Sequence, residues 1–250
     1  MSHAAMKSSA LRRALAIATI VTALFAVAVP PASALGLIRA ARDIELSGDR
    51  TFVKTNLRVT NTAPSLDLGV YFGIGGSDVQ NAVGVRMIQN GSDRESRQLL
   101  AYAYGEFRNV QGQACVGQGF VDCERKGFNW IEDRAYQVVL DRGNHTENGW
   151  LWTLKITDQK TNEVTPLLTL RSSDSALSLT ANRAFLDLSP NNCANINTAA
   201  GIVTKPRRQD GSTFGWGANA SYEEACASEA NTVAPITDTE FRPRISQGVS

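Results

Sequence analysis

Apolar and polar residues alternate with a period of two along most of this chain. In the segment Val53 to Val59, the apolar side chains fall on odd positions, and the charged Lys54 and Arg58 fall on even ones. This alternation is typical of a β-strand that turns one face toward a hydrophobic core. Stripes with helical spacing are scarce, so the pattern predicts an all-β protein.

The clearest pair of strands lies in the middle of the chain. Apolar residues share one face of Tyr136 to Asp141, and they occupy every even position of Trp150 to Thr157. The segment between them, Arg142 to Gly149, ends in Asn148-Gly149, a dipeptide typical of hairpin turns. We therefore expect a hairpin of two antiparallel strands with a long loop.

Other short segments show strand patterns and are separated by Gly, Asn and Asp. Strands at this density are typical of a sandwich of two antiparallel sheets. At most one short helix is expected, from Ser221 to Ala230, because Ser221 and Glu224 have capping-box spacing. The further expected strands are Asp43 to Ser47, Leu68 to Ile74, Val83 to Ile88, Gln98 to Phe107, Val164 to Leu170, Ala184 to Leu188, Gly201 to Lys205 and Phe214 to Ala218.

The N-terminus has the composition of an export signal. Basic residues precede an uncharged apolar run from Ala14 to Val29, and Pro30 to Ala34 supplies the small residues that a signal peptidase accepts. We predict a signal peptide over residues 1–34, cleaved after Ala34, and a secreted (extracellular) product. The alternative is a retained anchor, but the apolar run is short for a bilayer, which needs roughly 20 residues.

Residues 35–240 are predicted to form one β-sandwich domain, and residues 241–250 a flexible C-terminal tail, because Pro243 and Gly248 interrupt any pattern there. Outside the signal the chain has 22 basic and 24 acidic residues. This balance argues against nucleic acid as a partner, since phosphate binding needs a clustered basic surface. No later apolar stretch is long enough for stable membrane insertion, and the pattern gives no oligomeric state.

The four cysteines suit structural disulfides in an oxidising compartment. Four cysteines allow three pairings, and proximity in sequence favours Cys115 with Cys123 and Cys193 with Cys226. A zinc site is disfavoured, because the C-x-x-C spacing and nearby histidines are missing. Loops rich in Asp and Asn suggest turns rather than calcium ligands, so we expect neither a metal nor another cofactor.

No catalytic set stands out. His145 is the only histidine after the signal, and it lies in the expected hairpin loop among residues typical of turns. The acidic neighbours Glu132 and Asp133 would point to opposite faces of a strand, as would Glu223 and Glu224, so neither pair is a preformed acid and nucleophile. We therefore assign no catalytic residue.

Aromatic side chains are the candidate ligand contacts, because they can cover the apolar face of a sugar ring. Trp150 and Trp152 share a face with core residues, which favours burial. Trp216 lies between Gly215 and Gly217, where missing side chains would leave its ring uncovered. The candidate ligand-binding residues are Trp216, Trp130, Tyr102, Tyr104 and Tyr71.

Two motifs carry a resemblance to known proteins. Tyr71-Phe72-Gly73-Ile74 and the run from Trp130 to Tyr136 resemble a secreted bacterial family of uncharacterised domains with a concanavalin-like jelly-roll fold. The second run matches W-x-x-G-x-x-Y except that Asp133 replaces the glycine, and Asp visits left-handed turn conformations more readily than most residues. Gly75 stands where the family has a glutamine. The resemblance implies a fold and leaves the activity open.

These observations lead to three functional hypotheses. The first is a secreted non-catalytic β-sandwich that binds a carbohydrate or cell-envelope glycan. The second is a glycoside hydrolase or polysaccharide lyase whose acidic residues converge from separate strands, although the E-x-D-x-x-E spacing of several jelly-roll glucanases is missing. The third is an extracellular protein-binding or structural module, which predicts an exposed apolar patch.

Overall fold

The structure is a computed structural model of the chain. Contacts within it group Leu35–Ser250 into one compact unit. The described part contains no helix with the length and hydropathy that crossing a bilayer requires. The described residues are 37–48, 50–75, 81–111, 117–126, 128–172, 178–190, 193, 196–219, 222–223, 226, 230–233 and 235–247.

Sixteen strands lie within these residues, and they account for nearly all of the regular structure. Their bounds are β1 Ile38–Glu45, β2 Phe52–Asn61, β3 Leu66–Ile74, β4 Ala82–Gln89, β5 Arg97–Gln111, β6 Gly117–Lys126, β7 Tyr136–Thr146, β8 Gly149–Asp158, β9 Val164–Ser172, β10 Leu179–Leu188, β11 Ala199–Thr204, β12 Gly215–Asn219, β13 Tyr222–Glu223, β14 Ala230–Val233, β15 Glu240–Phe241 and β16 Arg244–Gln247.

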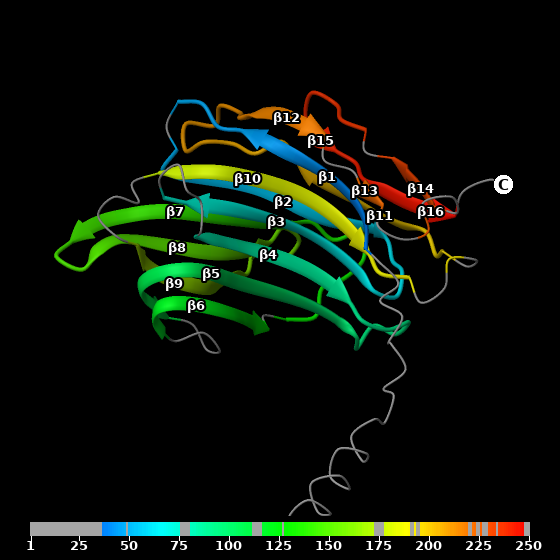
Figure 1. Cartoon of the computed structure of the whole chain (residues 1–250), viewed down its shortest axis with the longest axis horizontal. Helices are drawn as coiled ribbons and strands as arrows, with labels where there is room; N and C mark the ends of the chain where they lie inside the picture. The colour runs from blue at the N-terminus through cyan, green and yellow to red at the C-terminus, as the bar shows by residue number, and fades with distance from the viewer. Residues whose placement is uncertain are drawn as a thin grey trace, which may run out of the picture. The chain divides into compact units, whose positions relative to one another are not determined.

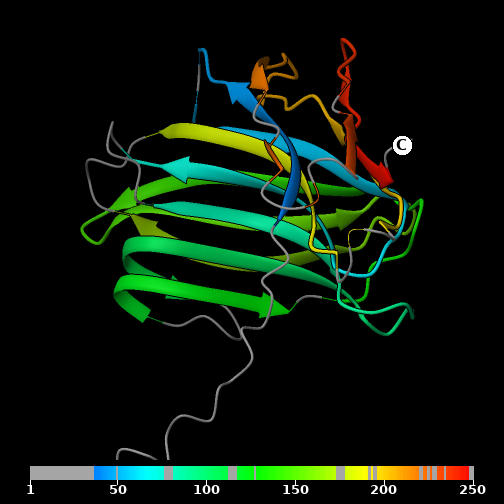
Figure 2. The ribbon, with the colours of Figure 1, turned by 45° about the vertical axis from the view of Figure 1, so that its right-hand side comes forward.

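The strands form two antiparallel sheets packed as a sandwich (Figures 1 and 2). The first sheet has the order β12-β1-β10-β3-β4-β5-β6, and the second has the order β9-β8-β7-β2-β11-β16-β14. The long strand β5 belongs to the first sheet, and its residues 109–111 pair with β9 of the second. The predicted all-β sandwich is confirmed.

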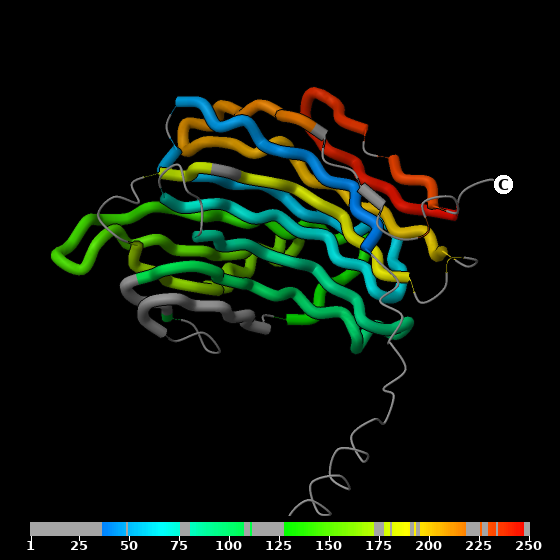
Figure 3. The backbone as a smooth tube through the Cα atoms, viewed as in Figure 1, coloured from blue at the N-terminus to red at the C-terminus, as the bar shows by residue number. Residues whose placement is uncertain are grey.

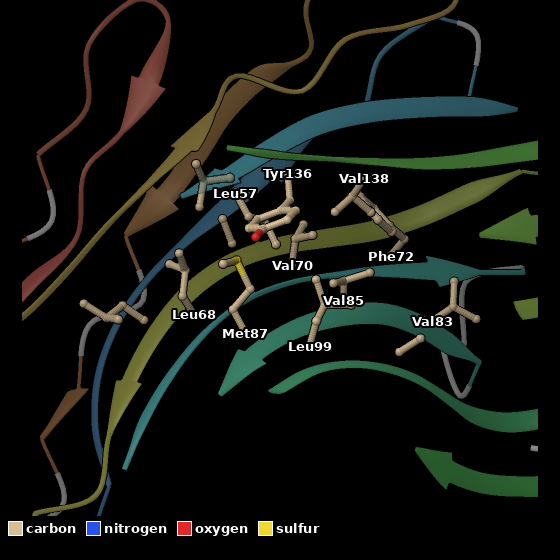
Figure 4. Packing of buried hydrophobic residues seen from close by; sticks show 14 of the residues in the cluster. Leu57, Leu68, Val70, Phe72, Val83, Val85, Met87, Leu99, Tyr136 and Val138 are labelled. Carbon is tan, nitrogen blue, oxygen red and sulfur yellow. The ribbon is translucent and has the colours of Figure 1, made fainter. Parts of the chain in front are cut away.

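One face of each central strand fills the space between the sheets. In β3, Leu68, Val70 and Phe72 are completely buried. Figure 4 shows them in one cluster with Met87 of β4 and with Tyr136, which comes from β7 of the second sheet. Removing such apolar surface from water stabilises a fold by roughly 25 cal/mol per Å². This buried layer therefore fixes which residues each strand turns outward.

The expected hairpin exists, but its expected long loop is wrong. Strands β7 and β8 continue to a two-residue connection at 147–148, with a register shift between Arg142 and His145. Pairing extends this far because it needs only backbone groups, and because the Arg142 guanidinium carbon packs 4.1 Å from the centre of the Trp150 ring. The polar residues Arg142 to Thr146, which were expected in a loop, therefore belong to β7.

The expected helix at 221–230 is not formed by its described residues. Tyr222–Glu223 forms β13, whose residues pair with Arg39 and Ile38 of β1, and Ala230 begins β14. An edge of β1 offers unpaired backbone groups at this position, and satisfying them by pairing outweighs the capping pattern.

The C-terminal segment differs from the expected tail. Strands β15 and β16 both pair with β11, beside which they run in Figure 3. Phe241 and Ile245 are completely buried. Pro243 lies between the two strands, where its carbonyl accepts a hydrogen bond from the Gly201 N–H at 3.1 Å. Two buried side chains thus anchor a segment in which a proline suggested fraying.

The Trp130 to Tyr136 motif is a structural turn. Asp133 has φ 60°, which confirms the left-handed conformation expected where the motif has glycine. The Trp130 indole N–H donates to the Ile88 carbonyl at 2.9 Å, and the Tyr136 hydroxyl accepts from the Ile131 N–H at 2.9 Å. These bonds fasten the turn to β4 and to β7.

One of the two expected disulfides is present. Cys193 and Cys226 are bonded, with 5.1 Å between their Cα atoms. Cys115 lies outside the described residues, as does the side chain of Cys123, so their pairing stays a prediction. The observed bond ties the segment after β10 to the segment before β14.

Replacing Cys193 and Cys226 together by serine should lower the free energy of unfolding by about 3.7 kcal/mol, because a 33-residue separation closes a long loop in the unfolded chain. Denaturant unfolding of the variant and the parent measures this difference. A loss below about 1 kcal/mol would contradict a stabilising role for this bond.

Candidate functional site

The candidate site lies on the face of the first sheet that points away from the core. In β3, Asp67, Gly69 and Tyr71 alternate with the buried apolar residues. Since successive side chains of a strand point to opposite faces, these three share the outer face. Their cross-strand partners in β10 are Asp187, Phe185 and Arg183.

Two glycines let aromatic rings lie down on the sheet. A Cβ atom at Gly69 would come within 2.6 Å of the Phe185 ring, and one at Gly84 would come within 2.6 Å of the Tyr102 ring. Each ring therefore covers a glycine of the neighbouring strand, an arrangement that only glycine permits. The rings form a floor that is lower than ordinary side chains would leave.

Two ion pairs cross the same floor. Arg39 of β1 donates to Asp187 through Nε, 2.5 Å from Oδ1, and through Nη2 to Oδ2. Arg86 of β4 donates to Oδ2 of Asp67 from Nε at 2.9 Å and from Nη2 at 2.5 Å. Because Asp67 and Asp187 face each other across β3 and β10, the charges run arginine, aspartate, aspartate, arginine over four adjacent strands.

Burial dominates the electrostatics of the central carboxyl groups. It raises the pKa of Asp67 to about 6, although the hydrogen bonds and charge of Arg86 act in the opposite direction. Burial also raises the pKa of Asp187, against the influence of Arg39. Oδ1 of Asp67 is buried without a hydrogen-bond partner among the described residues, which is consistent with a weakly stabilised anion.

The aromatic rings and the two ion pairs line a hollow of about 410 Å³ on this outer face. Its wall combines four aromatic rings with two guanidinium and two carboxyl groups, so it can offer both apolar faces and planar hydrogen-bonding groups to a ligand. We call it the tyrosine hollow. It is lined by Arg39, Asp67, Tyr71, Arg86, Tyr102, Tyr104, Phe185 and Asp187.

The structure brings three of the five candidate aromatic residues together. Tyr71, Tyr102 and Tyr104 come from β3 and β5 and line the tyrosine hollow. Tyr104 is the most open of them, with 45% of its surface exposed. Burial raises the pKa of Tyr102 above its ordinary value, in keeping with a ring laid against the sheet.

The two candidate tryptophans lie elsewhere. Trp130 is only 2% exposed, within the turn described above. Trp216 packs inward, with its ring centre 6.0 Å from that of Phe241. Strand alternation turns the flanking Gly215 and Gly217 outward instead, beside Glu45 and Asp43, so the glycines do not uncover the indole.

The other candidates for chemistry also have structural surroundings. The His145 ring lies 4.9 Å from the Trp150 ring at the end of the β7 and β8 hairpin. Glu132 pairs with Arg97, with 3.2 Å between Oε2 and Nη2. Within the described ranges no cluster of three or more His, Cys, Asp or Glu side chains could hold a metal ion. Large exposed apolar residues there come from separate segments, namely Tyr104, Ile131, Val164, Val233 and Ile236.

Sequence reasoning missed the charged part of the hollow. Asp67 and Asp187 are 120 positions apart in sequence, and each lies between two leucines of its strand. The signal available was a carboxyl group flanked on both sides by buried residues, as in Leu66-Asp67-Leu68 and Leu186-Asp187-Leu188. Without the strand order, nothing indicated that the two groups meet.

No family model matches the chain, and no curated protein matches it. Among solved structures, a scytalido-glutamic peptidase bound to a transition state analog inhibitor is similar with TM-score 0.51 and 11% identity, over 84% of this chain and 98% of that one. A second structure of that peptidase gives TM-score 0.50, 12% identity and the same coverage. A PL-14 alginate lyase from Aplysia kurodai gives TM-score 0.35 and 10% identity, over 58% of this chain and 72% of that one.

At these identities the likeness to the peptidase shows a shared β-sandwich fold and nothing more. The jelly-roll-like architecture implied by the sequence motifs agrees with it. Membership of an uncharacterised secreted family is not supported by a family model and stays a prediction.

The raised pKa of Asp67 has a measurable consequence for stability. Between the unfolded pKa near 4 and the folded value of about 6, the native state binds more protons than the unfolded state, so the contribution of Asp67 falls as pH rises. Replacing Asp67 by asparagine should remove this dependence. The free energy of unfolding of the parent minus that of Asp67→Asn should drop by up to about 3 kcal/mol from pH 4 to pH 7 and level off above it.

Chemical denaturation of both proteins across this pH range measures the difference. A difference that is constant from pH 4 to pH 7, or that rises with pH, would show that burial does not govern this carboxyl group.

Proposed function

We propose that this protein is a non-catalytic carbohydrate-binding module, and that it binds a glycan in the tyrosine hollow. The observation that carries the proposal is the convergence of four aromatic rings and two Arg–Asp pairs, from five strands, on one open face. A sugar ring offers an apolar face to an aromatic ring and hydroxyl groups to planar donors and acceptors.

The rigidity of the hollow supports binding. Phe185 and Tyr102 are held against glycines of neighbouring strands, and the Arg39 and Arg86 side chains are held by aspartates. Side chains that are already ordered lose little conformational entropy when a ligand arrives, which favours affinity. The disulfide Cys193–Cys226 and the predicted export signal fit a protein that meets glycans outside the cell.

A second candidate function is cleavage of the bound glycan. The observation that favours it is the facing pair Asp67 and Asp187, because glycoside hydrolysis uses two carboxyl groups, one of which acts as an acid. Binding remains the first proposal because both carboxylates are engaged by arginines. Release of reducing or unsaturated ends from a bound polymer at pH 5, abolished by Asp67→Asn, would favour cleavage over binding alone.

Replacing Tyr104 by alanine should weaken glycan binding about fivefold, because an exposed ring in contact with a sugar contributes on the order of 1 kcal/mol. The measurement is depletion and calorimetric titration with cellulose, chitin, laminarin and mannan. Ile131→Ala is the matched control, since Ile131 is 46% exposed against 45% for Tyr104 and lies outside the hollow.

The control variant should bind as the parent does. The proposal fails if the parent retains none of these polymers, or if Tyr104→Ala binds as tightly as Ile131→Ala does.

A further inference from the structure

The charged groups of the tyrosine hollow are arranged so that they cancel. Two arginines and two aspartates line it, and each arginine is paired with the aspartate of a neighbouring strand. In both pairs the arginine commits the edge formed by Nε and Nη2, one of the two edges of a guanidinium group that can bind a carboxylate bidentately. A carboxylate on a ligand would have to compete with an aspartate for that edge.

The aspartates lie beneath their arginines. The side chain of Asp187 is 6% exposed and that of Arg39 is 23% exposed, while Asp67 is 12% and Arg86 is 34% exposed. A ligand that enters the hollow therefore meets guanidinium groups whose charge is balanced from the side of the sheet. Balancing charges at contact distance leaves little net field for attracting an ion from solution.

We propose that Asp67 and Asp187 are specificity-determining residues, which mask the arginines of the hollow and thereby restrict it to uncharged glycans. This inference rests on the proposed function, since it concerns the ligand class of the same site. Acidic polysaccharides gain no net electrostatic attraction, and to use the Nε–Nη2 edge of either arginine they would have to displace a partly buried aspartate. Uncharged polymers use the aromatic floor without that cost.

Removing one aspartate unmasks an arginine without altering the shape of the hollow. Asp187→Asn leaves the Arg39 guanidinium with an uncharged neighbour and gives the hollow a net positive charge. Alginate should then bind about tenfold more tightly than it binds the parent at low ionic strength. The gain should vanish near 1 M salt, where screening extends over only about 3 Å.

The experiment compares alginate with the best uncharged polymer of the panel above, for the parent, Asp187→Asn and Asp67→Asn. Two variants are used in case one does not fold, which thermal melting checks. Glu240→Gln is the matched control: it makes the same change in net charge and also deprives an arginine, Arg242, of its partner, on β15 and away from the hollow. It should leave alginate binding as weak as in the parent.

The inference is overturned if the parent binds alginate as tightly as the uncharged polymer, or if the folded aspartate variants bind alginate no better than Glu240→Gln does. In either case the proposed function stands as long as Tyr104→Ala still weakens binding of the uncharged polymer. If the parent binds no uncharged polymer at all, the proposed function fails and this inference fails with it.

Discussion

Burial of one side-chain face of β3, β4, β5 and β10 against the second sheet is the constraint on which the candidate site depends. Successive residues of a strand must point to opposite faces, so a completely buried row such as Leu68, Val70 and Phe72 leaves no choice about which residues face outward. A slip of one residue in β3 or β10 would place Asp67 or Asp187 in the apolar core, where a carboxyl group without its arginine would strongly destabilise the fold. The hydrophobic core therefore positions the hollow as well as stabilising the fold.

The same two-residue period made most of the fold predictable from sequence. It identified nine of the longer strands in part or whole, because each has a continuous apolar face. It could not identify β15 and β16, whose stability comes from two buried side chains, Phe241 and Ile245, and from pairing with β11. Local sequence signals predicted a helix at 221–230, but Tyr222 and Glu223 pair with β1 instead.

The site was predictable only in its parts. Tyr71, Tyr102 and Tyr104 could be chosen as aromatic candidates from the sequence, whereas their proximity to one another depends on which strands are neighbours. The sequence order of the strands differs from their order in the sheet, since β10 lies between β1 and β3. For this reason Asp67 and Asp187, which face each other in space, carried no common signal. The inward placement of Trp216 was predictable from the sequence, because alternation alone puts it on the face opposite its glycines.

The depth of the hollow depends on two glycines, because neither has a side chain that would fill it. Gly69 and Gly84 allow Phe185 and Tyr102 to lie flat, and any Cβ at either position would collide with a ring and with a backbone carbonyl oxygen. Substitution there would raise the floor even though neither glycine touches a ligand. Because a backbone carbonyl oxygen also blocks each position, replacing the ring would not make room for a side chain there, so the backbone itself restricts both positions to glycine.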